Sequence, residues 1–215
     1  MQKHLALFAL SALAFFILFP PWAPYSSSVY ISLILLFLGL FLSNRDLKKA
    51  AIEFGILQPS NFQKAIFFGA IAYLLCFSAA IAISAIFSFF GILDSGKVMQ
   101  KMEHFPVSVL VFSFTIAPFA EEVFFRGFLL LKLSQILKGK FSFFVASVGS
   151  SIVFSAMHIS YGSIAQLAVA FVVGMILCAS VRISGMLLPA IVAHAVFNFA
   201  SVLLFLACKT GYCQF

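Results

Sequence analysis

Seven long apolar runs, joined by short polar connections, constrain this chain more than any other feature. They comprise residues 5–19, 28–42, 65–90, 106–133, 141–160, 164–181 and 185–207. A membrane-spanning helix needs about 20 mainly apolar residues, and a chain with 64% hydrophobic and only 9% charged residues is too apolar for a soluble domain. We therefore predict an all-α fold, a polytopic membrane helix bundle of about seven transmembrane helices, forming a single integral membrane domain over residues 1–215.

Two of these runs need separate comment. The first, residues 5–19, is short and follows Lys3, so a secretory signal is the alternative to a membrane helix. Trp22 and Tyr25 instead fit an aromatic belt at the membrane surface. In the fourth run, Pro118 lacks a backbone N–H, which predicts a loosened helix immediately before the charged residues that follow it.

The connections between the runs differ in their basic residues. With the N-terminus inside, nine Lys and Arg residues face the cytoplasm, whereas Lys97, Lys101 and Lys209 fall outside. The positive-inside rule then predicts that the N-terminus is inside and the C-terminus outside. We expect the membrane to be a prokaryotic cytoplasmic membrane. The net charge of +7 reflects this orientation, since no soluble basic face is left for a phosphate backbone. We expect membrane lipid as a partner and no nucleic acid.

The spacing of the four cysteines does not match that of a metal-binding or redox motif. Cys76 and Cys178 lie in apolar runs and Cys208 and Cys213 lie near the end of the chain, with no C-x-x-C pair. We interpret all four as packing residues, and a disulfide in the tail is the alternative.

Three charged residues inside the fourth run require a function. A charge in a membrane span costs roughly 2.5 to 3.5 kcal/mol on insertion scales. On a helix, Glu122 and Arg126 are i,i+4 neighbours that can pair, while Glu121 points about 100° away and has no such partner. Desolvation would make this spare carboxylate a competent general base. Helix–helix hydrogen bonding alone is the alternative.

Two later runs each bring a pair of unusual side chains to one helix face. Phe154 and His158 are four residues apart, and so are His194 and Asn198. A single histidine on an apolar face is usually a packing residue. Because polar side chains avoid lipid, however, polar groups on three helices are expected to meet inside the bundle.

These three segments, in order, resemble the motifs of the CPBP family, the CAAX protease and bacteriocin-processing family that is also called Abi. The motifs are Glu121-Glu122-Val123-Phe124-Phe125-Arg126, Phe154-x-x-x-His158 and His194-x-x-x-Asn198. Each one alone is short, but three in this order on predicted spanning helices form a specific pattern. The resemblance implies an all-helical intramembrane endopeptidase with a family core at about residues 106–207.

By position, the resemblance also assigns roles. Glu121 and His158 would activate the attacking water, and His194 and Asn198 would stabilise the oxyanion. Three further residues would support this arrangement: Glu122, Arg126 and Phe154. The residue types agree, because a free carboxylate, an imidazole and two donors are what water activation and oxyanion binding need.

A cofactor is not favoured by the sequence. Zinc held by His158, His194 and Glu121 is the alternative. The chain has no H-E-x-x-H motif and asparagine is a poor zinc ligand, so we favour a metal-independent glutamate mechanism over zinc.

The expected substrates are membrane-anchored or lipidated peptides and proteins, cleaved near their C-termini. The predicted topology places His158 near the outer end of its helix, which favours exported substrates such as C-terminal sorting signals over prenylated cytoplasmic tails. Two other functional classes stay open. One is a non-catalytic membrane scaffold or bacteriocin immunity protein, and the other is a proton-coupled transporter, which would be expected to show repeats and broken helices.

Overall fold

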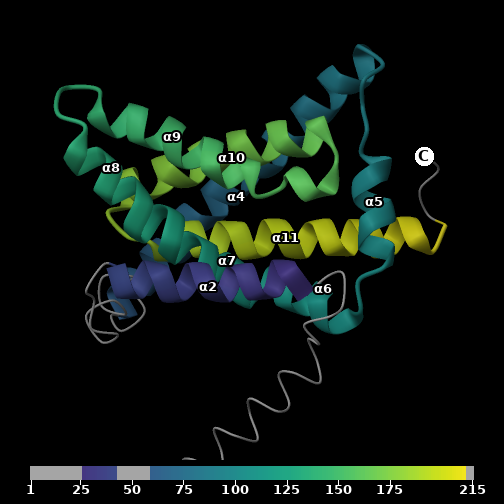
Figure 1. Ribbon diagram of the computed structural model, residues 1–215, viewed down its shortest axis with the longest axis horizontal. Helices are drawn as coiled ribbons and strands as arrows, with labels where there is room; N and C mark the ends of the chain where they lie inside the picture. Colours follow the sequence, from purple (N-terminus) through teal and green to yellow (C-terminus); the bar gives the residue numbers. More distant parts are fainter. Residues whose placement is uncertain (1–25, 43–58, 212–215) are drawn as a thin grey trace, which may run out of the picture.

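In the computed structural model, the described residues are 26–42 and 59–211, and within them the chain forms helices and short connections. Figure 1 shows their arrangement. In chain order the elements are α2 (Ser26–Leu42), α4 (Pro59–Phe89), α5 (Gly96–Glu103), α6 (Val107–Phe114), α7 (Ile116–Glu122), the π-helix η1 (Val123–Leu129), α8 (Leu130–Ile136), α9 (Ser142–Ala156), the 3-10 helix η2 (Ile159–Tyr161), α10 (Ile164–Ser184) and α11 (Leu188–Lys209).

Five helical segments of the described chain are long and apolar enough to cross a membrane. They are Asn61–Phe89, Val107–Ile136, Ser142–Tyr161, Ile164–Ser184 and Leu188–Lys209, and Val29–Leu40 forms a shorter apolar helix. These segments follow the predicted runs, so the polytopic helical membrane bundle is confirmed. The run at residues 5–19, with its alternative as a secretory signal, lies outside the described residues.

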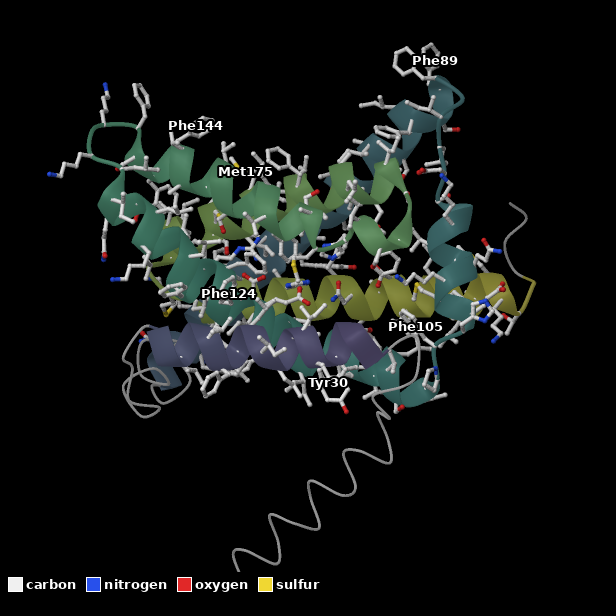
Figure 2. The ribbon with its side chains drawn as sticks, in the orientation of Figure 1. Tyr30, Phe89, Phe105, Phe124, Phe144 and Met175 are labelled. Atoms are coloured by element: carbon white, nitrogen blue, oxygen red, sulfur yellow. The ribbon has the colours of Figure 1, made fainter. Side chains whose placement is uncertain are left out.

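The outer surface of the bundle is apolar. Phe89 is 85% exposed and Phe144 is 60% exposed, and both side chains project away from the helices in Figure 2. Large exposed apolar side chains are unfavourable in water but have no such cost in contact with lipid tails. The surface therefore agrees with a bilayer as the solvent of this protein.

The centre of the bundle is formed by α4, α10 and α11, which pack closely on one another. In Figure 1, α11 runs between α2 on one side and α9 with α10 on the other. Small residues allow this close packing. The central cluster of buried residues consists of Ala72, Cys76, Val173, Leu177, Ala190 and Ala193.

The fourth span is broken where the sequence predicts loosening. Thr115 separates α6 from α7 and has a non-helical backbone, with φ −112° and ψ −80°. Pro118 has no N–H to donate to the carbonyl of Phe114, four residues earlier, and its ring would collide with that carbonyl. The elements that follow the break, α7 and the π-helix η1, carry the charged residues.

The cysteines behave in two ways. Cys76 and Cys178 are free and buried, in agreement with a packing role. Cys208 is disulfide-bonded, so the packing interpretation is wrong for this residue and the alternative holds. The reason is that Cys208 lies at the end of α11, beyond the closely packed centre.

Candidate active site

A buried ionic cluster joins α7, η1 and α11. Oε1 of Glu122 accepts hydrogen bonds from Nη1 of Arg126 and from Nδ1 of His194, both at 2.8 Å. Glu122 and Arg126 are fully buried, and His194 is 3% exposed. The pairing of Glu122 with Arg126 agrees with their i,i+4 spacing. The same carboxylate also holds His194, from a helix 72 residues further along the chain.

Arg126 makes a second hydrogen bond that fixes the cluster in the bundle. Its Nη2 donates to the backbone carbonyl of Gly174 in α10, at 3.1 Å. This carbonyl is accessible because Gly174 has no side chain, and α9 lies so close there that a Cβ atom on Gly174 would meet Ser151 at 2.9 Å. A guanidinium shared between a carboxylate and a carbonyl connects three elements of the bundle.

Glu121 is oriented differently from Glu122. Its side chain is 20% exposed, and its Oε2 lies 3.9 Å from Nε2 of His194. Glu121 does not pair with Arg126, as the helical geometry predicts. The carboxylate is therefore free of a strong ion pair within the described part of the chain.

The hydrogen bonds of both histidines define which ring nitrogen faces the site. In His194, Nδ1 donates to Glu122, so Nε2 is the atom that faces Glu121. In His158, Nδ1 lies 2.9 Å from the carbonyl of Phe154. A carbonyl only accepts hydrogen bonds, so Nδ1 carries the proton and Nε2 has a free lone pair when the ring is neutral.

Phe154 lies at the centre of these groups. Its ring centroid is 5.0 Å from that of His158 and 5.6 Å from that of His194. The guanidinium carbon of Arg126 lies 4.6 Å from the same centroid, over the ring. Phe154 is 1% exposed. It therefore separates two imidazoles and a guanidinium at fixed distances, which goes beyond the expected packing beside His158.

Asn198 lies one helical turn after His194 on α11. Its Nδ2 donates to the backbone carbonyl of Ser113 in α6, at 2.8 Å. An amide nitrogen has two N–H donors, so one is left for another acceptor. Inside a helix, the carbonyl of Ser113 would accept a hydrogen bond from the backbone N–H four residues later. The break after α6 interrupts this pattern, so the carbonyl is available to Asn198.

A cavity of about 280 Å³ opens beside these residues. It is lined by α4, α5, α6, α10, α11 and the segment between α9 and α10, and its walls include His158, Tyr161, Asn198, Ser113, Met99 and Met102. Glu121 and His194 are outside its walls. The structure thus places the seven predicted site residues in one connected region, with His158 and Asn198 at the cavity.

Sequence reasoning missed Tyr161 and Gly174. The Tyr161 ring is stacked on His158 with centroids 6.1 Å apart. Its position three residues after His158 was a usable signal, because i,i+3 neighbours share a helix face. A glycine within an apolar run gives no comparable signal that its carbonyl receives Arg126.

The sequence offers His158, His194 and Glu121 as ligands for zinc. The described residues contain no group of three or more His, Cys, Asp or Glu side chains placed to hold a metal ion. His158, His194 and Glu121 do not form such a group.

The fold and the site together define a polytopic membrane protein with a buried cluster of carboxylates and imidazoles, the arrangement expected of an intramembrane hydrolase. Residues 103–200 match a family model described as Rce1-like, type II CAAX prenyl endopeptidase Rce1-like. The match is consistent with the CPBP family that the three motifs predicted, and it includes every predicted site residue. No curated protein and no solved structure matches the chain. The similarity to the family model supports an intramembrane endopeptidase in general.

Proposed function

We propose that this protein hydrolyses a peptide bond near the C-terminus of a membrane-anchored substrate, with Glu121 as general base. One observation carries the proposal. Glu121 faces Nε2 of His194 at 3.9 Å, while Glu122 fixes the other nitrogen of the same ring at 2.8 Å. One carboxylate is thus committed to structure and the other is left for proton transfer.

The distance between Glu121 and His194 suits a bridging oxygen atom. At 3.9 Å the two atoms are too far apart for a direct hydrogen bond, but an oxygen atom can lie about 2.8 Å from each of them. In the proposed first step, Glu121 takes a proton from a water molecule, with Nε2 of His158 as the second acceptor. The water oxygen attacks the carbonyl carbon, and the proton passes to the amine that leaves.

His194 and Asn198 are proposed to stabilise the oxyanion. The attacking oxygen and the oxyanion are bonded to the same carbon, so the groups that bind them must be neighbours, as Glu121 and His194 are. Because Nδ1 of His194 already donates to Glu122, donation from Nε2 requires a doubly protonated ring. The second N–H of Asn198 supplies another donor. Glu122, Arg126 and Phe154 hold these donors in place.

The substrate side of the site follows from topology. With the N-terminus inside, the span that ends at Tyr161 runs outward, and His158 lies near its outer end. A disulfide at Cys208 agrees with this orientation, because disulfides persist outside the cytoplasm. We infer that the substrates are exported, membrane-anchored proteins or peptides cleaved a few residues from their C-termini, in a prokaryotic cytoplasmic membrane.

The test is mass spectrometry of C-terminal peptides from cells that express the wild type, Glu121→Ala or Glu103→Ala at equal membrane levels. Glu103 is an exposed carboxylate on α5 and serves as the control. We expect specific fragments from the wild type and from Glu103→Ala that are absent from Glu121→Ala, and these fragments identify the substrate. Identical peptide profiles for the wild type and Glu121→Ala would instead support a non-catalytic scaffold or immunity protein.

A further inference from the structure

Helix α5 forms part of the wall of the cavity beside His158 and Asn198. It lies across α11 in Figure 1, and Val98, Met99 and Met102 form part of the cavity wall. None of its residues is buried, so α5 is attached to the bundle mainly by a few side chains. One of these side chains is Lys101, which precedes Met102.

Lys101 reaches from α5 to the segment that follows His158. Its Nζ donates to the carbonyl and to the hydroxyl of Ser160, both at 2.9 Å. It also lies 4.8 Å from the ring centroid of Tyr161. Burial lowers the pKa of the Lys101 ammonium from its ordinary value. This is a cation that has lost part of its hydration and gained only neutral partners.

The other cations near the cavity differ from Lys101 in this respect. Lys97 is 59% exposed and lies 3.5 Å from Asp94, and Arg126 is paired with Glu122. Asp94 itself is satisfied, since it accepts hydrogen bonds from Ser163 and from the backbone N–H groups of Ile164 and Ala165. Among the described residues, no carboxylate lies within ion-pair distance of Lys101.

Lys101 lies close to His158, one of the residues proposed to activate the water. Tyr161 lines the cavity, with its ring 4.8 Å from Nζ of Lys101 on one side and 6.1 Å from the ring of His158 on the other. An extended peptide spans about 3.3 to 3.6 Å per residue, so only a short stretch of peptide separates an anion at Lys101 from a bond at His158. An ammonium has three N–H donors, and Ser160 accepts from two of them, which leaves the third for an incoming ligand.

We propose that Lys101 binds the C-terminal carboxylate of the substrate, and so selects free C-termini and sets which peptide bond reaches His158. This inference rests on the proposed endopeptidase function and assigns it a specificity residue on α5. A carboxylate on Lys101 would supply the negative partner that this cation lacks. The apolar wall formed by Met99 and Met102 would contact the side chains between the carboxylate and the cleaved bond.

The experiment compares two forms of one probe. A lipidated synthetic peptide library with randomised C-terminal residues is made once with a free carboxylate and once as the C-terminal amide. Purified full-length protein in proteoliposomes is given each form, and released fragments are quantified by mass spectrometry to obtain kcat and KM. The variants are Glu121→Ala, Lys101→Met, Lys101→Arg and Lys97→Met. The last of these removes a charge one turn earlier on the same helix. Size-exclusion profiles establish that each variant is folded.

We expect the wild type to prefer the free acid by about tenfold, mainly through KM. Lys101→Met is expected to lose the preference by weakening binding of the acid alone, whereas Lys101→Arg and Lys97→Met keep it. If Lys101 only holds α5 in place, Lys101→Met will impair acid and amide equally, and the assignment is wrong. A wild type that cleaves both forms equally also overturns it but leaves the endopeptidase function intact. Absence of any Glu121-dependent cleavage removes that function, and this inference with it.

Discussion

Nδ1 of His194 lies 2.8 Å from Oε1 of Glu122, so the carboxylate that neutralises Arg126 also fixes the histidine of the third motif. The adjacent Glu121 lies 3.9 Å from the opposite nitrogen of the same ring. Two neighbouring acids in the sequence therefore face opposite nitrogens of one imidazole, and of the two only Glu122 hydrogen-bonds to it. The first consequence is that their substitutions should have different effects.

Glu122→Gln is expected to destabilise the protein, and Glu121→Gln is expected to inactivate it. Loss of the Glu122 charge leaves Arg126 buried without its counter-ion, and breaking a buried ion pair costs about 3 to 5 kcal/mol. Glu121 makes no comparable contact, so its substitution should change stability by less than about 1 kcal/mol while cleavage falls by about 10²- to 10⁴-fold. Thermal unfolding in detergent and peptide release measure the two effects. Equal losses of stability would contradict this division of roles.

Gly174→Ala is expected to separate α9 from α10. The new Cβ would meet Cβ and Oγ of Ser151 at 2.9 Å and its Cα at 3.3 Å, and overpacking of this kind costs about 1 to 3 kcal/mol. The shift would also stretch the hydrogen bond from Arg126 to the Gly174 carbonyl, so cleavage should fall together with the unfolding temperature.

Gly149→Ala is the matched control for this substitution, because Gly149 is a glycine inside the neighbouring helix α9. A Cβ there would lie 3.6 Å from Leu133, which is an ordinary contact. Alanine is about 1 kcal/mol better than glycine inside a helix, so this variant should be as stable as the wild type or more so. A larger loss for Gly149→Ala than for Gly174→Ala would contradict the role of close packing at Gly174.

Most of the fold could be predicted from the sequence, because the length of an apolar run alone identifies a membrane span. The broken fourth span was also predictable, since Pro118 acts on a carbonyl only four residues away. The spacing of Glu122 and Arg126 predicted their pairing for the same local reason. These features depend on neighbours along one helix, for which the geometry is known in advance.

Contacts between distant segments could not be predicted in this way. Asp94 and Ser163 are 69 residues apart, and Lys101 and Ser160 are 59 residues apart. Both contacts depend on how the connections fold over the ends of the helices, for which the sequence has no periodic pattern. The same limit applies to Glu122 and His194, whose meeting depends on the rotation of α11 about its axis.

Peptide release by the purified protein is expected to be insensitive to chelators. Glu121, His158 and His194 do not form a three-ligand group, and the proposed mechanism uses only proton transfer and hydrogen bonding. Activity should therefore persist after treatment with 1,10-phenanthroline or EDTA, with metal content measured by mass spectrometry of the same sample. Loss of activity that returns on addition of zinc would require these side chains to move together and would support the zinc alternative.

Asp94 is expected to stabilise the contact between the α4–α5 connection and the start of α10 at neutral pH. The hydrogen bond from Ser163 is the largest cause that lowers the pKa of Asp94, to about 2, and the N–H groups of Ile164 and Ala165 and the charge of Lys97 act in the same direction. Because the folded pKa is below the ordinary value of 3.8, the stabilisation is complete above about pH 4 and is lost as the pH falls toward 2. Asp94→Asn should therefore unfold at a lower temperature than the wild type at pH 7.

The unfolding temperatures of the wild type and Asp94→Asn at several pH values test whether the charge of Asp94 provides the stabilisation. The difference between the wild type and Asp94→Asn should be constant from pH 7 to about pH 5 and should shrink below about pH 4, because Asp94 then takes up a proton in the unfolded chain and keeps its charge in the folded protein until the pH approaches 2. Lys97→Met removes only the smallest contribution to the lowered pKa of Asp94. The unfolding temperature of this variant should therefore stay well above that of Asp94→Asn at pH 7. A difference that stays constant to pH 3 would show that the asparagine acts through the shape of the helix cap rather than through the lost charge.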